Sequence, residues 1–438
     1  MPSPPRLSVV VPAFENAAEL DVTLGSLARQ TMPPGEFEVV VADDGSAAPL
    51  APVVDKYADR IDVRCVRDER NRGRSANRNA GAAHARAAVL VFLDSDTVAH
   101  PDLIRRHWAF HASRAGRPGV LLGRRLDCDW AAGDALRRGE IPAAPLVDHY
   151  RGDPRDAHCS LPQHWQDFRR APWLLGFTHN ASVDRATFLA AGGFDETMVK
   201  WGLEDNEMFY RVFHHHGGPP DLFEVDRDAV AYHLPHYRRT GELLGTMDNL
   251  RYVARKHPRY EFEAMHSQGT LGQVMGRVRL YGDAVAACRR EGLGRPDHLP
   301  APLRETLAAG SALAIGFGVA KLPLGPGSYT FDHDAPLGET NWHRVGLMLH
   351  DFKAGQFDVL VNVDLWRFLL PEDLSLHLTK GLRKADRIDL VASRTALDPA
   401  SLLPLPFVTD LPYLADLLHP SLKVELAQYP QVTVLSVR

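Results

Sequence analysis

Short apolar runs alternate with segments of helical periodicity along the first part of the chain. The run LSVVV from Leu7 to Val11 has the β-branched density of a buried parallel strand, and the polar AFENAAEL that follows starts a helix. The segments FEVVVADDGS and AVLVFLDSD predict two more strands, with an Ala-rich helix, RSANRNAGAAHARA, between them. This alternation predicts an α/β fold with an open, doubly wound sheet.

Polar and acidic residues follow each of these three predicted strands. In chain order they are Glu15 and Asn16, Asp43 and Asp44, and Asp94 and Asp96. Ligands of open α/β sheets bind in the crevice outside the carboxyl ends of the strands. We therefore expect these side chains, distant in sequence, to meet in one crevice.

The rest of the chain suggests two domains. Residues 126–173 show no period and are expected to form irregular excursions around the site, whereas residues 240–290 return to helical spacing. We interpret residues 1–290 as a catalytic domain with a helical extension over 240–290, and the Pro- and Gly-rich residues 291–305 as a linker. Residues 306–438 then form a second, smaller Rossmann-like α/β domain.

The motif FLDSD places Asp94 and Asp96 two residues apart where a strand runs into a turn. A single DxD occurs in many surface loops, but this one directly follows the buried run AVLVFL. Both carboxylates can therefore reach one cation that bridges two phosphate oxygens, so the motif predicts metal or ribose binding.

A second acidic pair, Glu204 and Asp205, opens a predicted helix in GGFDETMVKWGLEDNEMFYRVF. Acidic residues cap helices because they meet unpaired N–H groups and the positive end of the dipole, and capping accounts for one of the two. The presence of both acidic residues next to Trp201 and Gly202 indicates a role beyond helix capping.

Six motifs in order resemble the inverting family 2 glycosyltransferases of the GT-A fold, namely VVVPAFEN, VVVADDGS, NRGRSANRNAG, FLDSD, GGFDE and WGLEDNE. The resemblance extends over roughly residues 5–260. It implies transfer of a sugar from a nucleoside-diphosphate donor with the help of a divalent metal. UDP-sugars are the default donors, with guanosine and thymidine donors left open, and the acceptor is a glycan, a small metabolite or a peptide.

The resemblance also implies a role for each matching residue on the donor side. Pro12, Phe14 and Glu15 would border the base and Asp44 would pair with its polar edge, whereas Asp43 either contacts the nucleotide or buttresses the loop. Arg74 would contact base or phosphate, Asp94 ribose or metal, and Arg78 would support the strand ends by charge-assisted bonds.

On the acceptor side, the same resemblance makes Asp205 the general base and Glu204 a hydrogen-bond partner of an acceptor hydroxyl. Trp201, next to Gly202, would stack on the acceptor, although a plain core role stays open for it. The metal would be held by Asp96 and His233, with Asp94 as a further ligand and His236 as the less favoured histidine. Histidine among the ligands favours Mn²⁺ over Mg²⁺. The run from His214 to His216 is expected to be a solvated helix end.

The last part of the chain resembles the later half of a class I methyltransferase through FDVLVNVD, RIDLVAS and a terminal VTVLSVR. Its glycine loop, from Gly316 to Gly318, is only GxG, a weak signal. Asp332 or Asp334 could hold a ribose, but they follow the loop sooner than is usual. We therefore expect a non-catalytic, protein-docking domain without S-adenosylmethionine, and keep a bifunctional glycosyltransferase and methyltransferase as an alternative.

Composition and charge limit which partners and which cellular location are expected. The formal charge of −5 over 438 residues argues against nucleic acid as a partner, and the arginines between Arg67 and Arg78 suit a diphosphate. Four scattered cysteines without CxxC spacing suggest reduced thiols, and no apolar run has the length of a membrane span, so a cytoplasmic protein is expected. A non-catalytic scaffold and a nucleotidyltransferase remain as other classes.

Overall fold

The chain divides into two compact units, residues 1–249 and residues 250–438. The computed structural model describes residues 4–140, 153, 155–156, 162–236, 240–266, 270–394 and 411–438. The boundary lies earlier than the expected one at residue 290. The reason is that helix α12 (Leu271–Glu291) buries Tyr281, Ala284 and Cys288 in the same core as Leu313 and Ile315 of the second unit.

The first unit is built on an eight-stranded sheet with the order β3-β2-β1-β4-β7-β6-β8-β5. Strands β3, β2, β1 and β4 run parallel, β7 is antiparallel to both β4 and β6, and β5 is antiparallel to β8. The strands are β1 (Leu7–Ala13), β2 (Phe37–Asp43), β3 (Asp62–Arg67), β4 (Val89–Leu93), β5 (Thr97–Ala99), β6 (Val120–Asp127), β7 (Asn180–Asp184) and β8 (Phe223–His233). The predicted α/β class is confirmed, and the three predicted strands are β1, β2 and β4. Strand β3, with charged residues in DVRCVR, was not anticipated.

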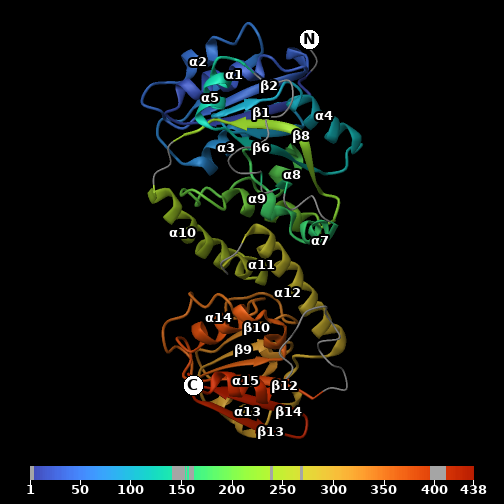
Figure 1. The fold of residues 1–438 in the computed structure, drawn as a ribbon, viewed down its shortest axis with the longest axis vertical. Coiled ribbons are helices and arrows are strands. Elements are labelled where there is room, and N and C mark those ends of the chain that lie inside the picture. Colours follow the sequence, from blue (N-terminus) through green and yellow to red (C-terminus); the bar gives the residue numbers. More distant parts are fainter. Residues whose placement is uncertain are drawn as a thin grey trace. The chain divides into compact units, whose positions relative to one another are not determined.

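Helices cover both faces of this sheet (Figure 1). The helices of this unit are α1 (Ala17–Leu27), α2 (Ala51–Asp55), α3 (Arg74–Ala83), α4 (Leu103–Ser113), α5 (Trp130–Arg137), α7 (Pro162–Arg170), α8 (Arg185–Ala190), α9 (Glu204–His215) and the first part of α10 (Thr240–Lys256). Helices α5 and α7 correct the expectation of an irregular segment over 126–173, although most of residues 141–161 lie outside the described part.

The alternation of β1 side chains explains how the two helical layers are held. Val9 and Val11 are fully buried in one core with Leu20 and Leu24 of α1. Val10 faces the other way, where a Cβ built on Gly81 would lie 2.5 Å from its Cγ1. Glycine at position 81 therefore lets α3 approach the sheet closely, which brings the N-terminus of α3 to the carboxyl edge of the strands.

The second unit contains a six-stranded sheet with the order β10-β9-β11-β12-β14-β13. Strands β9 to β12 are parallel, and β14 is antiparallel to both of its neighbours. Its elements are β9 (Ala312–Gly316), β10 (Tyr329–Asp332), β11 (Val359–Val363), β12 (Ile388–Ser393), β13 (Val424–Gln428), β14 (Val432–Val437), α11 (Tyr260–Glu263), α12, α13 (Ala301–Ala309), α14 (Pro371–Gly381) and α15 (Leu411–Leu418). The expected second, smaller α/β sheet is confirmed.

A buried glutamate makes the stability of the second unit sensitive to pH. Burial raises the pKa of Glu261 in α11 to about 7. Because the folded-state pKa lies above the unfolded value, the protonated form is favoured, and its stabilisation is fully present near pH 4 and lost as the pH rises through 7. We expect Glu261→Gln to raise the unfolding free energy at pH 8 by about 1–3 kcal/mol.

Urea titrations of the wild type and Glu261→Gln at pH 8 and pH 5 check this expectation. The gain should shrink markedly at pH 5, where most of the glutamate is already neutral in the folded state. An equal gain at both pH values would mean that the substitution acts through packing and not through the charge.

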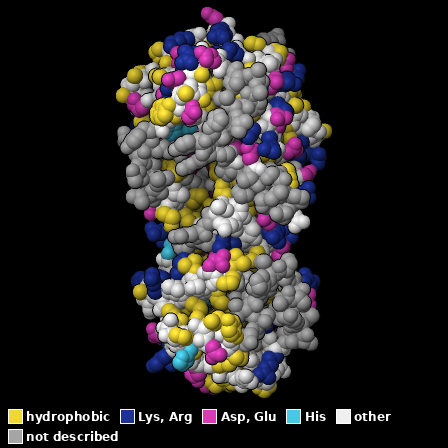
Figure 2. Space-filling model, in the orientation of Figure 1, with side chains coloured by type: hydrophobic (Ala, Val, Ile, Leu, Met, Phe, Trp, Pro, Cys, Tyr) yellow, Lys and Arg dark blue, Asp and Glu magenta, His cyan; other side chains and the backbone are white. Residues whose placement is uncertain are grey.

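Among the side chains that Figure 2 colours by type, charged groups of both signs are interspersed without a large patch of one sign. This distribution agrees with the small net charge. Among the helices of the described residues, none combines the length and the apolar character needed to cross a membrane.

Candidate active site

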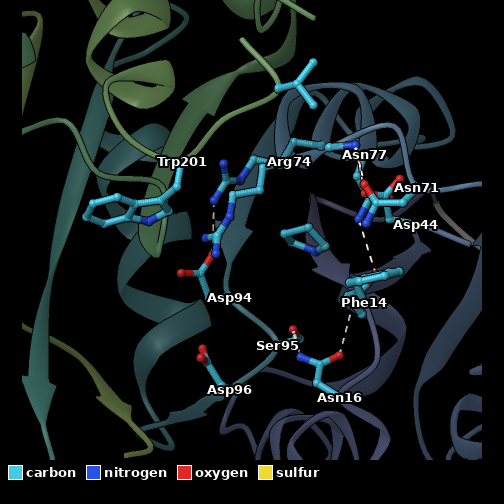
Figure 3. Close-up of a pocket in the computed structure, with 15 residues that line it drawn as sticks. Phe14, Asn16, Asp44, Asn71, Arg74, Asn77, Asp94, Ser95, Asp96 and Trp201 are labelled. Atoms are coloured by element: carbon cyan, nitrogen blue, oxygen red, sulfur yellow. Dashed lines mark hydrogen bonds and ion pairs between the residues drawn. The ribbon is translucent and has the colours of Figure 1, made fainter. Parts of the chain in front are cut away.

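A cavity of about 440 Å³ opens at the carboxyl ends of β1, β2 and β4 in the first unit. Its wall includes five of the predicted donor-side residues, Pro12, Phe14, Asp44, Arg74 and Asp94, together with Asp96 and Trp201. Trp201, Asp94 and Asp96 lie on one side of this cavity, and Phe14, Asp44 and Asn71 lie on the other (Figure 3). The structure thus brings together residues from strand ends far apart in sequence.

A second cavity of about 280 Å³ adjoins the first. The two cavities share Arg74, Arg78, Asp94, Asp96 and Trp201. The remaining lining residues of the second cavity are Arg125, Phe177, His179, Glu204, Asp205, His233 and His236. Five of the predicted donor residues therefore line one cavity, Glu204 and Asp205 line the other, and the DxD aspartates lie on the shared wall.

The two aspartates that end β2 have different environments. Asp44 lines the first cavity and accepts hydrogen bonds from the backbone N–H groups of Arg72 (2.7 Å) and Gly73 (3.0 Å). Burial raises its pKa. Asp43 is fully buried and accepts from Ser46 N at 2.9 Å and Leu50 N at 3.2 Å. Asp43 therefore buttresses the loop after β2 and does not line either cavity.

Residues after β1 also separate into two roles. Phe14 is 44% exposed and lines the first cavity, where its ring is available to a flat base. Glu15 lines neither cavity, because its carboxylate accepts a hydrogen bond from Ala47 N at 2.6 Å and holds the loop after β2. Of the three residues expected to border a base, Pro12 and Phe14 line the first cavity.

Arg78 in α3 connects the acidic residues of both cavities. It is 2% exposed, and its guanidinium lies 3.3 Å from Asp94 Oδ1, 3.4 Å from Glu204 Oε1 and 3.3 Å from Asp205 Oδ1. Burial disfavours the charged guanidinium, but the carboxylates of Asp205, Asp94 and Glu204 outweigh burial and raise its pKa. Arg78 therefore links the carboxylate that follows β4 to the two carboxylates at the start of α9.

The acidic pair at the start of α9 is held in a fixed geometry. Asp205 accepts hydrogen bonds from Thr178 N (3.0 Å) and Thr178 Oγ1 (2.6 Å), and its side chain remains 16% exposed. Glu204 accepts from Gly202 N at 2.8 Å, and burial followed by the charge of Asp205 raises its pKa. Each oxygen of a carboxylate has two lone pairs, so Asp205 keeps the capacity to accept a proton from a bound molecule.

A cluster of three potential metal ligands lies on the wall of the second cavity. The ligand atoms of Asp96, His233 and His236 all lie within 4.8 Å of one another. Asp96 Oδ1 is buried and has no hydrogen-bond partner in the described structure, so one oxygen is available to a cation. Asp94 instead pairs with Arg78, and His236, which the sequence favoured less, takes the third place in the cluster.

Asp127 orients His233 within this cluster. Its Oδ1 lies 3.1 Å from His233 Nδ1, which leaves Nε2 facing Asp96. Burial favours the neutral imidazole of His233, but the hydrogen bonds to Asp127 and Asp96 favour the charged form more strongly and raise its pKa to about 9. A carboxylate that fixes one imidazole nitrogen is the usual support of a metal-binding histidine, so these residues fit a divalent metal such as Mn²⁺.

Several cavity residues were missed in the sequence. They are Asn71, Asn77 and Ser95 in the first cavity and Arg125, Phe177 and His179 in the second. The first three lie inside the quoted motifs, so their position next to assigned residues was an available signal. The others come from β6 and from the loop before β7, and nothing local in the sequence marks them.

We expect Arg78→Met to destabilise the first unit by about 3–5 kcal/mol, because it leaves the carboxylates of Asp94, Glu204 and Asp205 without their buried counter-charge. Urea unfolding at pH 7 measures this loss. The matched control is Arg72→Met, whose side chain is 43% exposed and pairs with an exposed Glu196, and which should cost less than about 1 kcal/mol. Equal effects of the two substitutions would contradict the central place of Arg78.

In the second unit, the crevice between the carboxyl ends of β9 and β11 is occupied by the chain itself. Gly294 O accepts a hydrogen bond from Phe317 N at 2.9 Å, and Gly294 N donates to Asp364 Oδ2 at 2.8 Å. Asp332 accepts from Gly318 N and Ala320 N, at 2.9 and 2.8 Å. The GxG loop and the proposed ribose aspartate are therefore engaged with neighbouring backbone.

Two family models match the chain in the region of these cavities. Residues 8–151 match glycosyl transferase family 2, and residues 172–235 match the model described as the N-terminal domain of galactosyltransferase. These matches lie in the first unit and support an enzyme of the glycosyltransferase type.

Individual relatives agree with this class. The chain is 35% identical over 289 residues to validoxylamine A glucosyltransferase of Streptomyces hygroscopicus subsp. limoneus, which covers 62% of this chain and 61% of that enzyme. It is 28% identical over 245 residues to chondroitin synthase of Pasteurella multocida, with 52% and 24% covered. A crystal structure of S. aureus TarS 1–349 in complex with UDP-GlcNAc aligns with a TM-score of 0.42 and 18% identity, over 57% of this chain and 66% of that one. The chain thus spans about three fifths of the length of its glucosyltransferase relative.

Proposed function

We propose that the first unit transfers a hexose from a nucleoside-diphosphate sugar to a hydroxyl group of an acceptor, with inversion at the anomeric carbon. The observation that carries this proposal is the pair of adjoining cavities. One is lined by Phe14 and Asp44, the other by Glu204 and Asp205, and Asp94 and Asp96 lie on their shared wall. A donor in the first cavity would present its sugar to an acceptor in the second.

The residues of this chain divide the chemistry between them. Phe14 offers a flat apolar face to the base, and Asp44 accepts hydrogen bonds from the edge of the base. The positively charged guanidinium of Arg74 pairs with the diphosphate. Asp205 takes the proton of the acceptor hydroxyl as that oxygen attacks the anomeric carbon from the side opposite the diphosphate. Thr178 and Arg78 hold Asp205 in place for this step, because they contact both of its oxygens.

We propose that Asp96, His233 and His236 hold a divalent metal, with Mn²⁺ favoured by the two imidazoles. A cation there would supply positive charge against the developing negative charge of the leaving diphosphate. Asp94, paired with Arg78, is better placed for ribose than for the metal. This assignment replaces Asp94 by His236 as the third ligand.

The donor and acceptor classes follow from the cavities and the relatives together. UDP-glucose is our first choice of donor, since the most similar relative named above is a glucosyltransferase. Phe177 and Trp201 line the second cavity beside two carboxylates, a combination that suits a polyhydroxylated ring. We therefore propose a glycan or a small hydroxylated metabolite as acceptor, in preference to a peptide.

Isothermal titration with UDP, GDP and dTDP, each with Mn²⁺ and with EDTA, tests the donor side. Metal-dependent binding of one nucleotide is the expected result. Transfer is then assayed from UDP-glucose to validoxylamine A and to p-nitrophenyl glycosides. Binding of none of the three nucleotides would exclude the transferase proposal, and pyrophosphate release from a nucleoside triphosphate would favour a nucleotidyltransferase.

We further propose that the second unit is a class I methyltransferase-like domain without methyltransferase activity, which docks a protein partner. Its parallel strands followed by the antiparallel β14 support the resemblance. The position of Gly294 over the GxG loop argues against a cofactor site. Titration of the full-length protein with S-adenosylmethionine should give no binding heat, and micromolar binding would favour the bifunctional alternative.

A further inference from the structure

Three consecutive carbonyl groups of the loop before α9 are held by side chains of one helix, α10. Asn249 Nδ2 donates to Lys200 O at 2.9 Å and to Gly202 O at 2.7 Å. Thr246 Oγ1 lies 3.4 Å from Trp201 O. The carbonyl groups of the residues before and after Trp201 are therefore both held by a single amide, that of Asn249.

The backbone of this loop needs such support. Gly202 has φ +101° and Leu203 has φ +68°, so two successive residues lie in the left-handed region. A non-glycine residue in this region costs free energy and persists only where its surroundings determine it. A Cβ on Gly202 would lie 2.7 Å from Thr246 Oγ1, which shows how closely α10 packs on the loop.

The loop of residues 200–203 connects the proposed catalytic carboxylates, Glu204 and Asp205, to Trp201 on the cavity wall. Gly202 N donates to Glu204 Oε2 at 2.8 Å, while Gly202 O accepts from Asn249, so this one residue is fixed from both sides. Trp201, its neighbour, lines both cavities. Asn249 is 5% exposed and lines neither cavity, so water has little access to replace its two donated bonds, and it does not touch a substrate there.

From this geometry we propose that Asn249 is a positioning residue, which fixes Trp201 at the junction of the two cavities and thereby sets how the acceptor is held against the donor sugar. The part of this proposal that concerns the acceptor rests on the proposed transferase function. The part that concerns the placement of Trp201 stands on the hydrogen bonds alone.

The test compares two substitutions one residue apart. Asn249→Asp keeps the shape of the side chain, but replaces the donating amide by an oxygen that faces two carbonyl oxygens. The control is Asp248→Asn, which removes the exposed ion pair with Lys200 Nζ, 2.6 Å long, and leaves the backbone bonds intact. Thermal unfolding verifies that both variants are folded.

The first readout needs no substrate. The protein contains 7 tryptophans, and ¹⁹F NMR of 5-fluorotryptophan-labelled full-length protein resolves them, with the Trp201 signal assigned by its absence in Trp201→Phe. Asn249→Asp should shift or broaden the Trp201 signal and leave the majority of the others in place, whereas Asp248→Asn should not. An unchanged Trp201 signal in Asn249→Asp would overturn the proposal.

The second readout is a double-mutant cycle on transfer from UDP-glucose to p-nitrophenyl β-D-glucoside with Mn²⁺. We expect Asn249→Asp to raise the acceptor KM or lower kcat by on the order of 10–100-fold at nearly unchanged UDP affinity. When Asn249→Asp is added to Trp201→Ala, it should cause little further loss of transfer, because both substitutions remove the correctly placed Trp201 side chain. Fully additive effects would refute an action through Trp201. Absence of all transfer in the wild type would count against the proposed function instead, and the NMR result would still decide the position of Trp201.

Discussion

Asp205→Asn should reduce transfer by about 100- to 10,000-fold while nucleotide affinity stays within about 3-fold of the wild type. Asparagine cannot accept the acceptor's proton, and it also loses the ionic contact of Asp205 Oδ1 with Arg78 at 3.3 Å. The donor cavity should be unaffected, because Asp205 lines only the second cavity. Steady-state kinetics and nucleotide titration on the same preparation measure both quantities.

Asp221→Asn is the matched control for this change. Its side chain is 59% exposed and pairs with Arg117 at the surface, so it should leave transfer unchanged. A strong loss of nucleotide binding in Asp205→Asn would indicate disturbed folding around Arg78, and an Asp205→Asn enzyme with nearly full activity would remove Asp205 from the role of base. Glu204 would then be the next residue to test, because its carboxylate lies beside Asp205 and its pKa is raised by burial.

Asp96→Ala should abolish the metal dependence of nucleotide binding, with a loss of at least about 100-fold in Mn²⁺-dependent affinity for UDP. The substitution removes the one carboxylate of the three-residue cluster and leaves His233 and His236 without the oxygen ligand. Titrations of UDP in the presence of Mn²⁺ and of EDTA give the effect directly. Asp102→Ala, at the half-buried residue before α4, is the control and should keep the full metal response.

The pH dependence of the same titration gives a second check on this cluster. The pKa of His233 is about 9 without metal, so at neutral pH a proton must leave before its nitrogen can bind a cation. Mn²⁺-dependent affinity should therefore rise from pH 7 to pH 9 in the wild type. A flat profile, or an unchanged metal response in Asp96→Ala, would place the metal elsewhere.

The local sequence determined the elements and the main acidic positions of the first unit. Runs rich in β-branched and other apolar residues, such as LSVVV and VLVFL, are typical of strands that are buried on both faces. Strands β1 and β4 were therefore predictable from their pattern. The pair Glu204 and Asp205 begins α9 as predicted, because acidic side chains are favoured in the first turn of a helix. That Asp44 and Asp94 line one cavity followed from parallel strands that end at one edge.

Only the tertiary structure decided which of these side chains are free to meet a ligand. Asp43 and Asp44 are neighbours in sequence, yet the turn after β2 uses Asp43 for its own backbone and leaves Asp44 at the cavity. His236 joins Asp96 because β8 lies beside β5, a pairing that no local pattern encodes. The same holds for Asn249, whose amide reaches the carbonyl groups around Trp201, and for Gly294, which fills the crevice of the second unit. These contacts depend on long-range packing, and local periodicity carries no information on which distant backbone groups a side chain will meet.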